Sequence, residues 1–280
     1  MFEVIVYESA YQTEPGNRGV RRHHAGYHLS RILGGADVHE NKDADFHHAS
    51  GFFFQPDFSS YKAFLSTGPQ SILGLLANSV IISLCTVGTT ILCAGLASYA
   101  FSRYRFRFRF SLLMVILGTR LLPPIVSLIP IYLSFNRLGL IDTRTGLVII
   151  YTALNLPFGT WLLKSYMDSI PVELEESGRV DGCTQLQSIV HILMPLVAPG
   201  LVAVAIFVFR SAWNEFMFAF IFSSTRARTL PIRIAETVGE MGIYWTDMAT
   251  LAVILMVPAL IFSFFMQKNL VKGLTAGALK

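Results

Sequence analysis

The residue types that point most directly to a function are three carboxylates in a polar segment, residues 173–199, which has a membrane-length apolar run on either side. Glu173, Glu175 and Glu176 fall where a helix would begin, and the helix dipole stabilises negative charge in the first turns. A polar segment of this kind, folded as two short helices on the surface, is typical of a docking device. The segment is therefore predicted to be a cytoplasmic docking surface and not a catalytic centre.

Local signals divide this segment into two short helices. Pro171 suits a first helical position, because its missing N–H is one of the donors that a helix start leaves unpaired. The pair Asp181-Gly182 should end that helix, since glycine takes the left-handed cap conformation at little cost. Thr184 and Gln187 form a capping box, which predicts the start of a second helix.

The composition predicts a membrane protein, because 53% of the 280 residues are hydrophobic and only 14% are charged. Long apolar stretches can each cross the roughly 30 Å of hydrocarbon as a helix. The predicted spans are residues 73–101, 111–135, 145–163, 192–222 and 248–266. Pro195 is expected to mark the turn from the polar segment into the fourth of them. Lipid offers the backbone no partners, so the predicted fold class is an all-α polytopic membrane protein, a bundle of transmembrane helices.

The distribution of arginines predicts the orientation. Four arginines between residues 103 and 109 follow the first span and should lie in the cytoplasm. Their alternation with aromatic residues is interpreted as a membrane anchor and not as a nucleic-acid patch. Successive crossings then put residues 136–143 and 223–247 outside, and the polar segment and the C-terminus inside. Three arginines between residues 226 and 233 would then lie outside, which goes against the rule that positively charged residues favour the cytoplasmic side.

Charged and polar groups within spans usually mark a pathway or a pair. Arg120 is followed by three prolines that should break or kink its helix, so it is predicted either to line a translocation path or to be held by freed carbonyls. Trp213, Asn214 and Glu215 form an aromatic and polar stretch that suits a sugar. The alternative places Trp213 in packing and Glu215 near the outer leaflet. Asn155 is a further candidate for the path.

The sequence predicts no catalytic or metal site. No Ser/His/Asp or metal-ligand arrangement occurs within the spans, and the three cysteines have no disulfide or metal spacing. The motif G-x-x-x-x-G-K-[ST], which cradles nucleotide phosphates, is absent from the whole sequence. We therefore expect a protein that is not an enzyme, has no cofactor, and relies on a separate subunit for any use of ATP.

The spacing of the polar segment resembles the E-A-A…G…I-x-L-P loop of the permease subunits of ATP-binding-cassette (ABC) importers. The matching residues are Glu176, Ser177, Gly178, Gly182, Ile192, Met194 and Pro195. Ser177, Gly178 and Met194 replace the usual Ala, Ala and Leu by small or apolar residues. The W-N-E-F stretch around Asn214 resembles sugar-importing permeases, and the last eight residues resemble the C-terminus of the family. The resemblance covers about residues 53–280.

This resemblance implies a permease subunit of a binding-protein-dependent, maltose-transporter-like carbohydrate importer in a bacterial or archaeal cell membrane. The implied partners are a second related permease, two ATPases, an external solute-binding protein and the lipid bilayer. The residues implied to couple to the ATPase are Glu173, Glu176, Ser177, Gly178, Asp181, Gly182, Ile192 and Pro195. An importer of a polyol or glycerol phosphate, and a non-transporting scaffold or polytopic enzyme, stay as alternatives.

Residues 1–51 form an atypical, charged segment that holds six of the seven histidines. It has no apolar run of spanning length and no features of a signal peptide. Permeases of the family usually have one further span here, so we expect that the upstream sequence is misread, by a frameshift or a wrong start. A histidine-rich metal-binding extension is the alternative. The predicted domains are thus residues 1–51 and a permease domain, residues 52–280.

Overall fold

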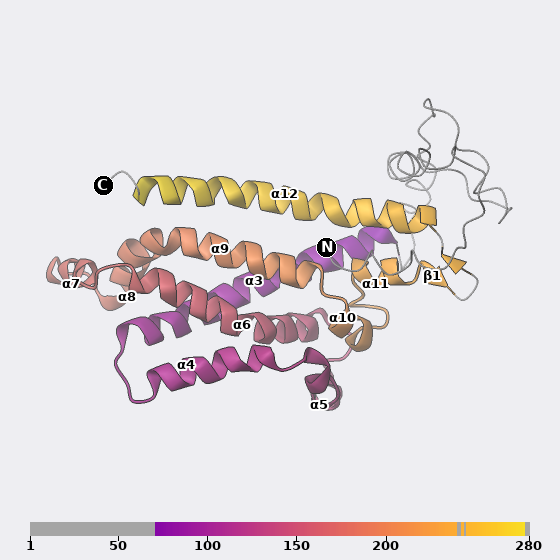
Figure 1. Cartoon of the computed structure of the whole chain (residues 1–280), viewed down its shortest axis with the longest axis horizontal. Coiled ribbons are helices and arrows are strands. Elements are labelled where there is room, and N and C mark those ends of the chain that lie inside the picture. Colours follow the sequence, from indigo (N-terminus) through magenta and orange to yellow (C-terminus); the bar gives the residue numbers. More distant parts are fainter. Residues whose placement is uncertain (1–70, 240–241, 244, 278–280) are drawn as a thin grey trace, which may run out of the picture. The chain divides into compact units, whose positions relative to one another are not determined.

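The computed structural model describes residues 71–239, 242–243 and 245–277. The predicted boundary at residue 51, the histidine-rich segment before it and the last three residues of the tail therefore lie outside the described residues. The described part is almost entirely helical, apart from one short hairpin, which confirms the predicted all-α membrane class (Figure 1).

The elements follow one another as a series of long helices separated by short ones. In chain order they are α3 (Ile72–Arg103), α4 (Arg109–Gly118), the 3₁₀ turn η3 (Thr119–Leu121), α5 (Pro124–Arg137), α6 (Arg144–Asp168), α7 (Glu173–Val180), α8 (Gln185–Ser188), the π-helical turn η4 (Ile189–Leu193), α9 (Met194–Trp213), α10 (Met217–Phe222), α11 (Leu230–Ala235), the paired strands β1 (Val238–Gly239) and β2 (Gly242–Ile243), and α12 (Trp245–Gly277).

Helices α3, α6 and α9 pack against one another, and α12 packs against α9 (Figure 1). Small side chains allow the close approach. A methyl group added at Gly159 of α6 would touch Thr90 and Ala94 of α3 and Val204 of α9. Close packing of this kind, and not the hydrophobic effect, holds helices together in lipid.

Among the residues that the structure describes, four helical segments are long and apolar enough to cross a membrane. They are Ile72–Arg103, Arg144–Asp168, the continuous run Gln185–Trp213 and Asp247–Phe265 within α12. A fifth crossing is counted only if Arg109–Leu121 and Pro124–Arg137, which meet at a 96° bend, form one broken span. The second of the five predicted spans is therefore not a straight helix.

The bend in the second span follows from its prolines, as the sequence predicted. Leu122 and Pro123 have extended backbone, with ψ angles of 130° and 127°. Each of them precedes a proline, whose ring disfavours helical backbone in the residue before it. Pro124 then stands at the start of α5, where its missing N–H costs nothing.

The predicted turn at Pro195 is wrong, because the helix continues through this residue. The helical run begins ten residues earlier, at Gln185, and continues through Pro195 into α9. Just before Pro195, the backbone forms the wider π-helical turn η4, in which the N–H of Met194 bonds to the carbonyl of Ile189. A π-helical turn of this kind absorbs a local mismatch without ending the helix.

The end of the predicted fourth span is also wrong, because the helix stops at Trp213. The Glu215 carboxylate accepts hydrogen bonds from the backbone N–H groups of Phe218 and Ala219, at 2.8 and 3.0 Å. These are donors that the start of a helix leaves unpaired. The carboxylate therefore starts a separate helix, α10, and breaks the run.

Asp142 lies in the loop between α5 and α6, and it joins this loop to the segment that follows α10. Its carboxylate accepts hydrogen bonds from the backbone N–H groups of residues 224–227 at 2.9–3.2 Å, and from Thr225 Oγ1 at 2.9 Å. Burial raises the pKa of Asp142, but these hydrogen bonds outweigh it and hold the pKa well below its ordinary value.

The amide of Asn78 in α3 ties the same loop to the bundle. Its Nδ2 donates to the carbonyls of Arg226 and Arg228, both at 2.9 Å, and its Oδ1 accepts from Arg144 Nε at 2.7 Å. Three segments far apart in the sequence are thus fixed at one end of the bundle.

Replacing Asp142 with asparagine should lower the stability of this end of the protein by about 2 kcal/mol, the usual cost of losing hydrogen bonds to a charged group. The native pKa is depressed, so the carboxylate stabilises the fold above its unfolded pKa of about 3.9, and that contribution declines as the pH falls toward the native pKa. The difference in melting temperature between Asp142→Asn and wild type, measured by tryptophan fluorescence, should therefore be full at pH 7 and smaller at pH 3.

Glu236→Gln is the matched control, since Glu236 is exposed and pairs with Arg228 and Arg233 in the same region. Such pairs contribute less than about 1 kcal/mol. Equal effects of the two substitutions would contradict the role given to Asp142.

Candidate functional site

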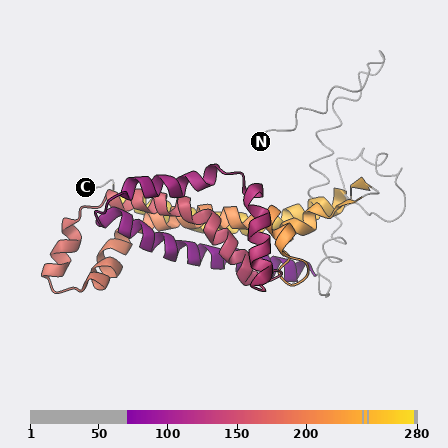
Figure 2. The same ribbon diagram turned by 90° about the horizontal axis from the view of Figure 1, so that it is seen from below.

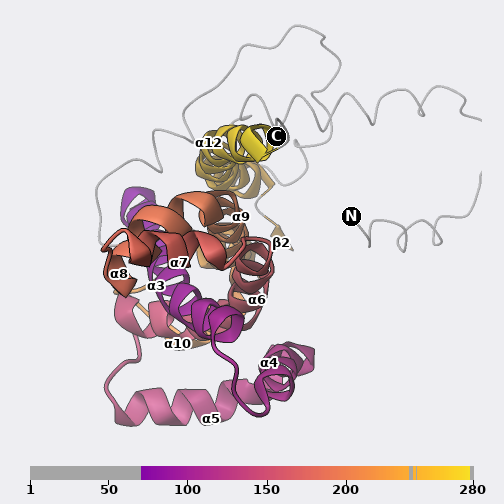
Figure 3. The ribbon, with the colours of Figure 1, turned by 90° about the vertical axis from the view of Figure 1, so that its left-hand side faces the viewer.

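Helix α7 and α8 form a helical hairpin, the elbow (residues 171–188), at one end of the bundle (Figures 2 and 3). The first helix begins at Glu173 with Val172 as its N-cap, so Pro171 precedes the helix and is not its first residue. The carbonyls of Pro171 and Val172 instead form a leading turn with the N–H groups of Leu174 and Glu175.

The turn between the two helices has the predicted caps. Asp181 is the C-cap, and Gly182 has a φ of +95°, in the left-handed region. The N–H of Gly182 bonds to the carbonyl of Arg179 at 3.1 Å, and that of Cys183 bonds to the carbonyl of Gly178 at 3.0 Å. This pair of bonds is the Schellman motif that closes a helix.

The second helix opens with the predicted capping box, which the structure confirms. Thr184 Oγ1 accepts from the N–H of Gln187 at 3.3 Å, and Gln187 Oε1 accepts from the N–H of Thr184 at 2.8 Å. The helix that starts here is not a short one, because it runs on without interruption into the membrane-length segment. The elbow is therefore continuous with a span.

Gly178 is buried where α7 crosses η4. A methyl group added at Gly178 would overlap Ile192 Cδ1. Gly178 and Ile192, which both belong to the loop that resembles ABC importer permeases, thus face each other directly. Any side chain larger than glycine must push α7 away from η4 or displace the Ile192 side chain.

The other predicted coupling residues face outward. Glu173, Glu176, Ser177 and Asp181 are exposed. Apolar side chains stand among them: Val180 is 87% exposed, and Leu174 and Leu186 are also exposed. Exposed aliphatic side chains with polar groups around them have the composition of a protein interface, which has an apolar core and a polar rim. Pro195, the last of the set, is exposed on α9.

Glu175 was not among the predicted site residues, yet it makes the closest polar contact of the elbow. Its Oε1 lies 2.6 Å from Arg103 Nε, at the end of α3, and its Oε2 accepts from the Tyr99 hydroxyl at 3.3 Å. The sequence offered one signal: Glu175 and Gly178 are three residues apart, on one helix face. These two are the buried residues of α7.

Arg120 lies in η3, just before the 96° bend. Its guanidinium stands over the rings of Phe158 in α6 and Phe207 in α9, with 5.7 and 5.5 Å from Cζ to the ring centroids. The rings are 4.2 Å apart, and Trp161 extends the aromatic group. Within the described part of the chain, Arg120 has no hydrogen bond to a freed carbonyl. Aromatic faces, and not backbone oxygens, therefore hold this cation.

The remaining path candidates differ in burial. Asn155 is 1% exposed between α6 and its neighbours, and its Nδ2 donates to the carbonyl of Tyr151. Trp213 is also 1% exposed; it stacks on Phe209, and its Nε1 donates to the carbonyl of Leu255 in α12 at 3.0 Å. The side chains of Asn155 and Trp213 thus both pack between helices of this chain.

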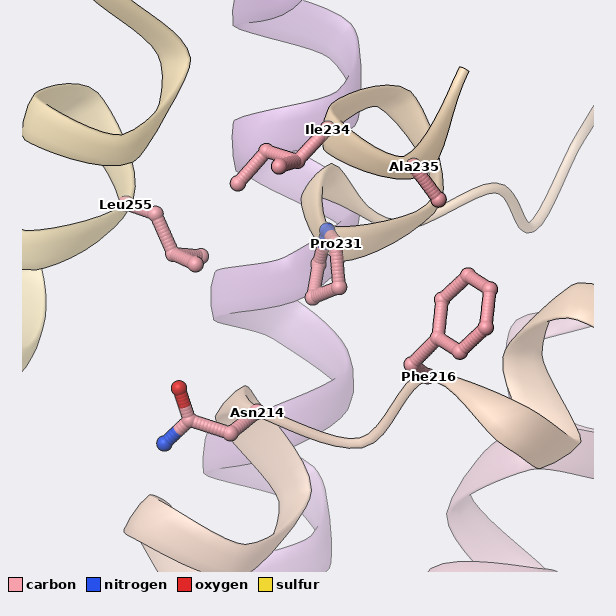
Figure 4. Close-up of a pocket in the computed structure, with 6 residues that line it drawn as sticks. All are labelled: Asn214, Phe216, Pro231, Ile234, Ala235 and Leu255. Carbon is pink, nitrogen blue, oxygen red and sulfur yellow. The ribbon is translucent and has the colours of Figure 1, made fainter. Parts of the chain in front are cut away.

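Asn214 and Phe216 line an open hollow of about 280 Å³ at the break between α9 and α10 (Figure 4). Pro231, Ile234 and Ala235 of α11 and Leu255 of α12 complete its walls. Asn214 donates to the carbonyl of Arg210 at 2.8 Å, and Glu215 caps α10. The hollow is mainly apolar, with one amide at its rim.

Comparison with known proteins gives the family of the chain. The family model described as the inner membrane component of binding-protein-dependent transport systems matches residues 89–276. The chain belongs to this family of permeases. It is 36% identical over 229 residues to the trehalose/maltose transport system permease protein MalG of Thermococcus litoralis, covering 81% of this chain and 82% of that protein.

Other relatives of this permease carry names of the same kind. The sulfoquinovosyl glycerol transport system permease protein SmoH of Agrobacterium fabrum is 35% identical, over 80% of this chain and 79% of its own. Among solved structures, a bacterial ABC transporter that imports the acidic polysaccharide alginate matches with a TM-score of 0.67 at 24% identity, over 86% of this chain and 88% of that one. At that identity the structural match shows the fold.

The family assignment confirms the predicted membrane transport class. In the part of the permease that the structure describes, no group of three or more His, Cys, Asp or Glu side chains is placed to hold a metal ion. Its polar features are concentrated instead at the elbow, at the Arg120 aromatic group and in the loops joined by Asp142.

Proposed function

We propose that this permease forms one transmembrane half of an ATP-driven carbohydrate importer and that its elbow docks on a separate ATPase in the cytoplasm. The observation that carries the proposal is the exposed face of α7, where Glu173 and Glu176 stand beside Leu174 and Val180. The sequence has no phosphate-binding motif of its own, so the energy of ATP must reach it through such a contact.

The proposed mechanism couples the closure of two ATPases to movement of the spans. The elbow is continuous with the run Gln185–Trp213, so a force on α7 and α8 acts directly on a helix that crosses the membrane. Rigid-body rocking of such helices would alternate access between the two sides. Glu176 and Asp181 would pair with basic or amide groups of the ATPase, and Gly178 and Gly182 would set the shape of the docking face.

The solute is proposed to be a carbohydrate, since relatives at 34–36% identity are named as permeases for trehalose/maltose and galactooligosaccharides. The candidate path fits this class of solute. Aromatic rings stack on the C–H faces of sugars, while polar groups bind the hydroxyls. Arg120 offers hydrogen-bond donors in front of Phe158 and Phe207. Asn155, Trp213, Asn214 and Glu215 stay proposals for the same path.

The proposed assembly contains a second related permease, two ATPases that bind the ATP, and an external solute-binding protein. It needs no cofactor within this chain. The elbow and the C-terminus would face the cytoplasm, in line with the arginines that follow the first span.

Cysteine crosslinking tests the docking proposal. With Cys85, Cys93 and Cys183 replaced by serine, a cysteine at Val180 should be captured by a bifunctional maleimide in native membranes. The captured protein should contain the motif G-x-x-x-x-G-K-[ST] and should be labelled by an azido-ATP probe. A membrane-impermeant maleimide added to intact cells should leave Val180→Cys unmodified.

A cysteine at Leu138 is the matched control, because Leu138 is 69% exposed at the end of α5, away from the elbow. It should react in intact cells and should capture no ATPase. Capture of a protein without the nucleotide motif, or labelling of Val180→Cys from outside the cell, would refute the proposed docking.

A further inference from the structure

The Arg103–Glu175 ion pair joins the elbow to the end of α3. Each side chain is 8% exposed, so this is the most buried ion pair in the described part of the chain. Arg103 is the last residue of α3, and Glu175 lies in the polar elbow. A buried pair at this position is costly to desolvate, and simple apolar packing would serve stability equally well.

The remaining hydrogen-bond capacity of the pair is directed at neighbouring segments. Arg103 Nη2 donates to the carbonyl of Ile170 at 3.2 Å, in the link between α6 and α7. Tyr99, one turn earlier in α3, donates to the second Glu175 oxygen at 3.3 Å. The Ser188 hydroxyl of α8 donates to the backbone carbonyl of Glu175 at 3.3 Å. One carboxylate residue thus ties α7 to α3, and its backbone ties α7 to α8.

A second group of contacts holds the start of α8 to the same end of α3. Gln185 Nε2 donates to the Tyr104 hydroxyl at 2.8 Å and to the Tyr99 hydroxyl at 3.4 Å. Ser102 Oγ donates to Asp168 Oδ1 at 2.7 Å, which joins α3 to the end of α6. Both helices of the elbow and the ends of two spans therefore share one hydrogen-bonded network.

We propose that the Arg103–Glu175 pair is a positioning device for energy coupling: it fixes α7 to the end of α3, so that a push on the elbow moves α3 and α6 together with α9. This inference rests on the proposed function, because it assumes that the push comes from an ATPase. A hinge at this point would let α7 follow the ATPase while the spans stayed still. A rigid, directional ion pair removes that freedom.

The test uses the complete importer, with its own ATPases and binding protein, reconstituted in liposomes. In Glu175→Gln, the solute transported per ATP hydrolysed should fall about tenfold, a typical size for a coupling free energy between two sites. The Val180→Cys crosslink to the ATPase should persist. Glu236→Gln, which removes the ion pairs with Arg228 and Arg233 away from the elbow, should leave the ratio unchanged.

The double variant Glu175→Gln/Arg103→Gln separates positioning from stability. Glu175→Gln alone leaves the Arg103 charge buried without its partner, which lowers the amount of folded protein. The double variant leaves no lone buried charge, so this amount should return to the wild-type level. The ratio of transport to hydrolysis should stay low, because the neutral amides do not reproduce the directional pair. Recovery of the ratio together with the protein would overturn the proposal and make the pair merely structural.

Spin labels at Leu96 and Val180, both exposed, provide a direct readout. In the wild type their distance should be the same with and without trapped ATP, whereas in Glu175→Gln it should change or broaden. A wild-type distance that shifts on ATP trapping would also overturn the inference, since α7 would then hinge against α3. Absence of the wild-type crosslink would instead refute the proposed function itself.

Discussion

Replacing Gly178 with valine is expected to lower solute uptake about tenfold, while the protein still folds and inserts. The new side chain would overlap Ile192 Cδ1 and force α7 away from η4. Overpacking of this kind costs about 2 kcal/mol. It acts on the angle of α7, because the elbow is otherwise held by the Glu175 contacts and the Gly182 turn. The measurement is uptake of radiolabelled solute into liposomes that contain the reconstituted importer.

A size series gives this prediction its control. Gly178→Ala adds one methyl group, and the atom it meets is the far end of the flexible Ile192 side chain, so the loss should be small. The variant Gly178→Val/Ile192→Ala removes the obstructing atoms and should recover most of the uptake. If Gly178→Val transports normally, or if Ile192→Ala fails to rescue it, the close contact of the two residues does not set the docking angle.

The turn chemistry of the elbow was predictable because it depends on neighbouring residues. Gly182 can be recognised as a helix end, and Thr184 with Gln187 as a capping box, from four or five consecutive positions. The helix start was placed too early at Pro171, since proline is compatible with both the first helical position and the turn before it. Local patterns therefore gave the caps and missed only a boundary.

Glu175 could not be predicted in the same way. Its partner Arg103 is 72 positions away in the chain, and only the folded structure brings the end of α3 to α7. From the sequence alone, Glu175 is one of three similar acids, and the helix dipole accounts for all of them. Asp142 is a comparable case, because the N–H groups that bind it follow 82–85 residues later.

Composition located the apolar stretches but not the ends of the helices. The stretch from 192 to 222 reads as one span, yet the Glu215 carboxylate starts a new helix within it. The burial of Trp213 against α12 depends on the position of Leu255, which the sequence does not give. The proline break in the second span was predictable, because a proline acts on its immediate neighbour.

Replacing Gly182 with valine is expected to uncouple ATP hydrolysis from transport. With a φ of +95°, Gly182 has a backbone that L-residues adopt at a cost of roughly 1–2 kcal/mol, and β-branched residues least readily. The cheapest relief is to open the Schellman turn, which frees the carbonyls of Gly178 and Arg179 and turns α7 away from α8. Hydrolysis should continue, while uptake falls at least about tenfold, within the range of coupling energies.

Gly139 provides a matched control for this substitution, because it ends α5 with the same pair of bonds. Its φ is +68°, its N–H bonds to the carbonyl of Asn136, and the N–H of Leu140 bonds to that of Phe135. Gly139→Val carries the same backbone conflict away from the elbow, so it should lower the melting temperature without changing the transport per ATP. Gly182→Asn, which tolerates the left-handed conformation, should stay close to wild type. Full coupling in Gly182→Val, or equal uncoupling by Gly139→Val, would mean that the elbow turn does not transmit the force.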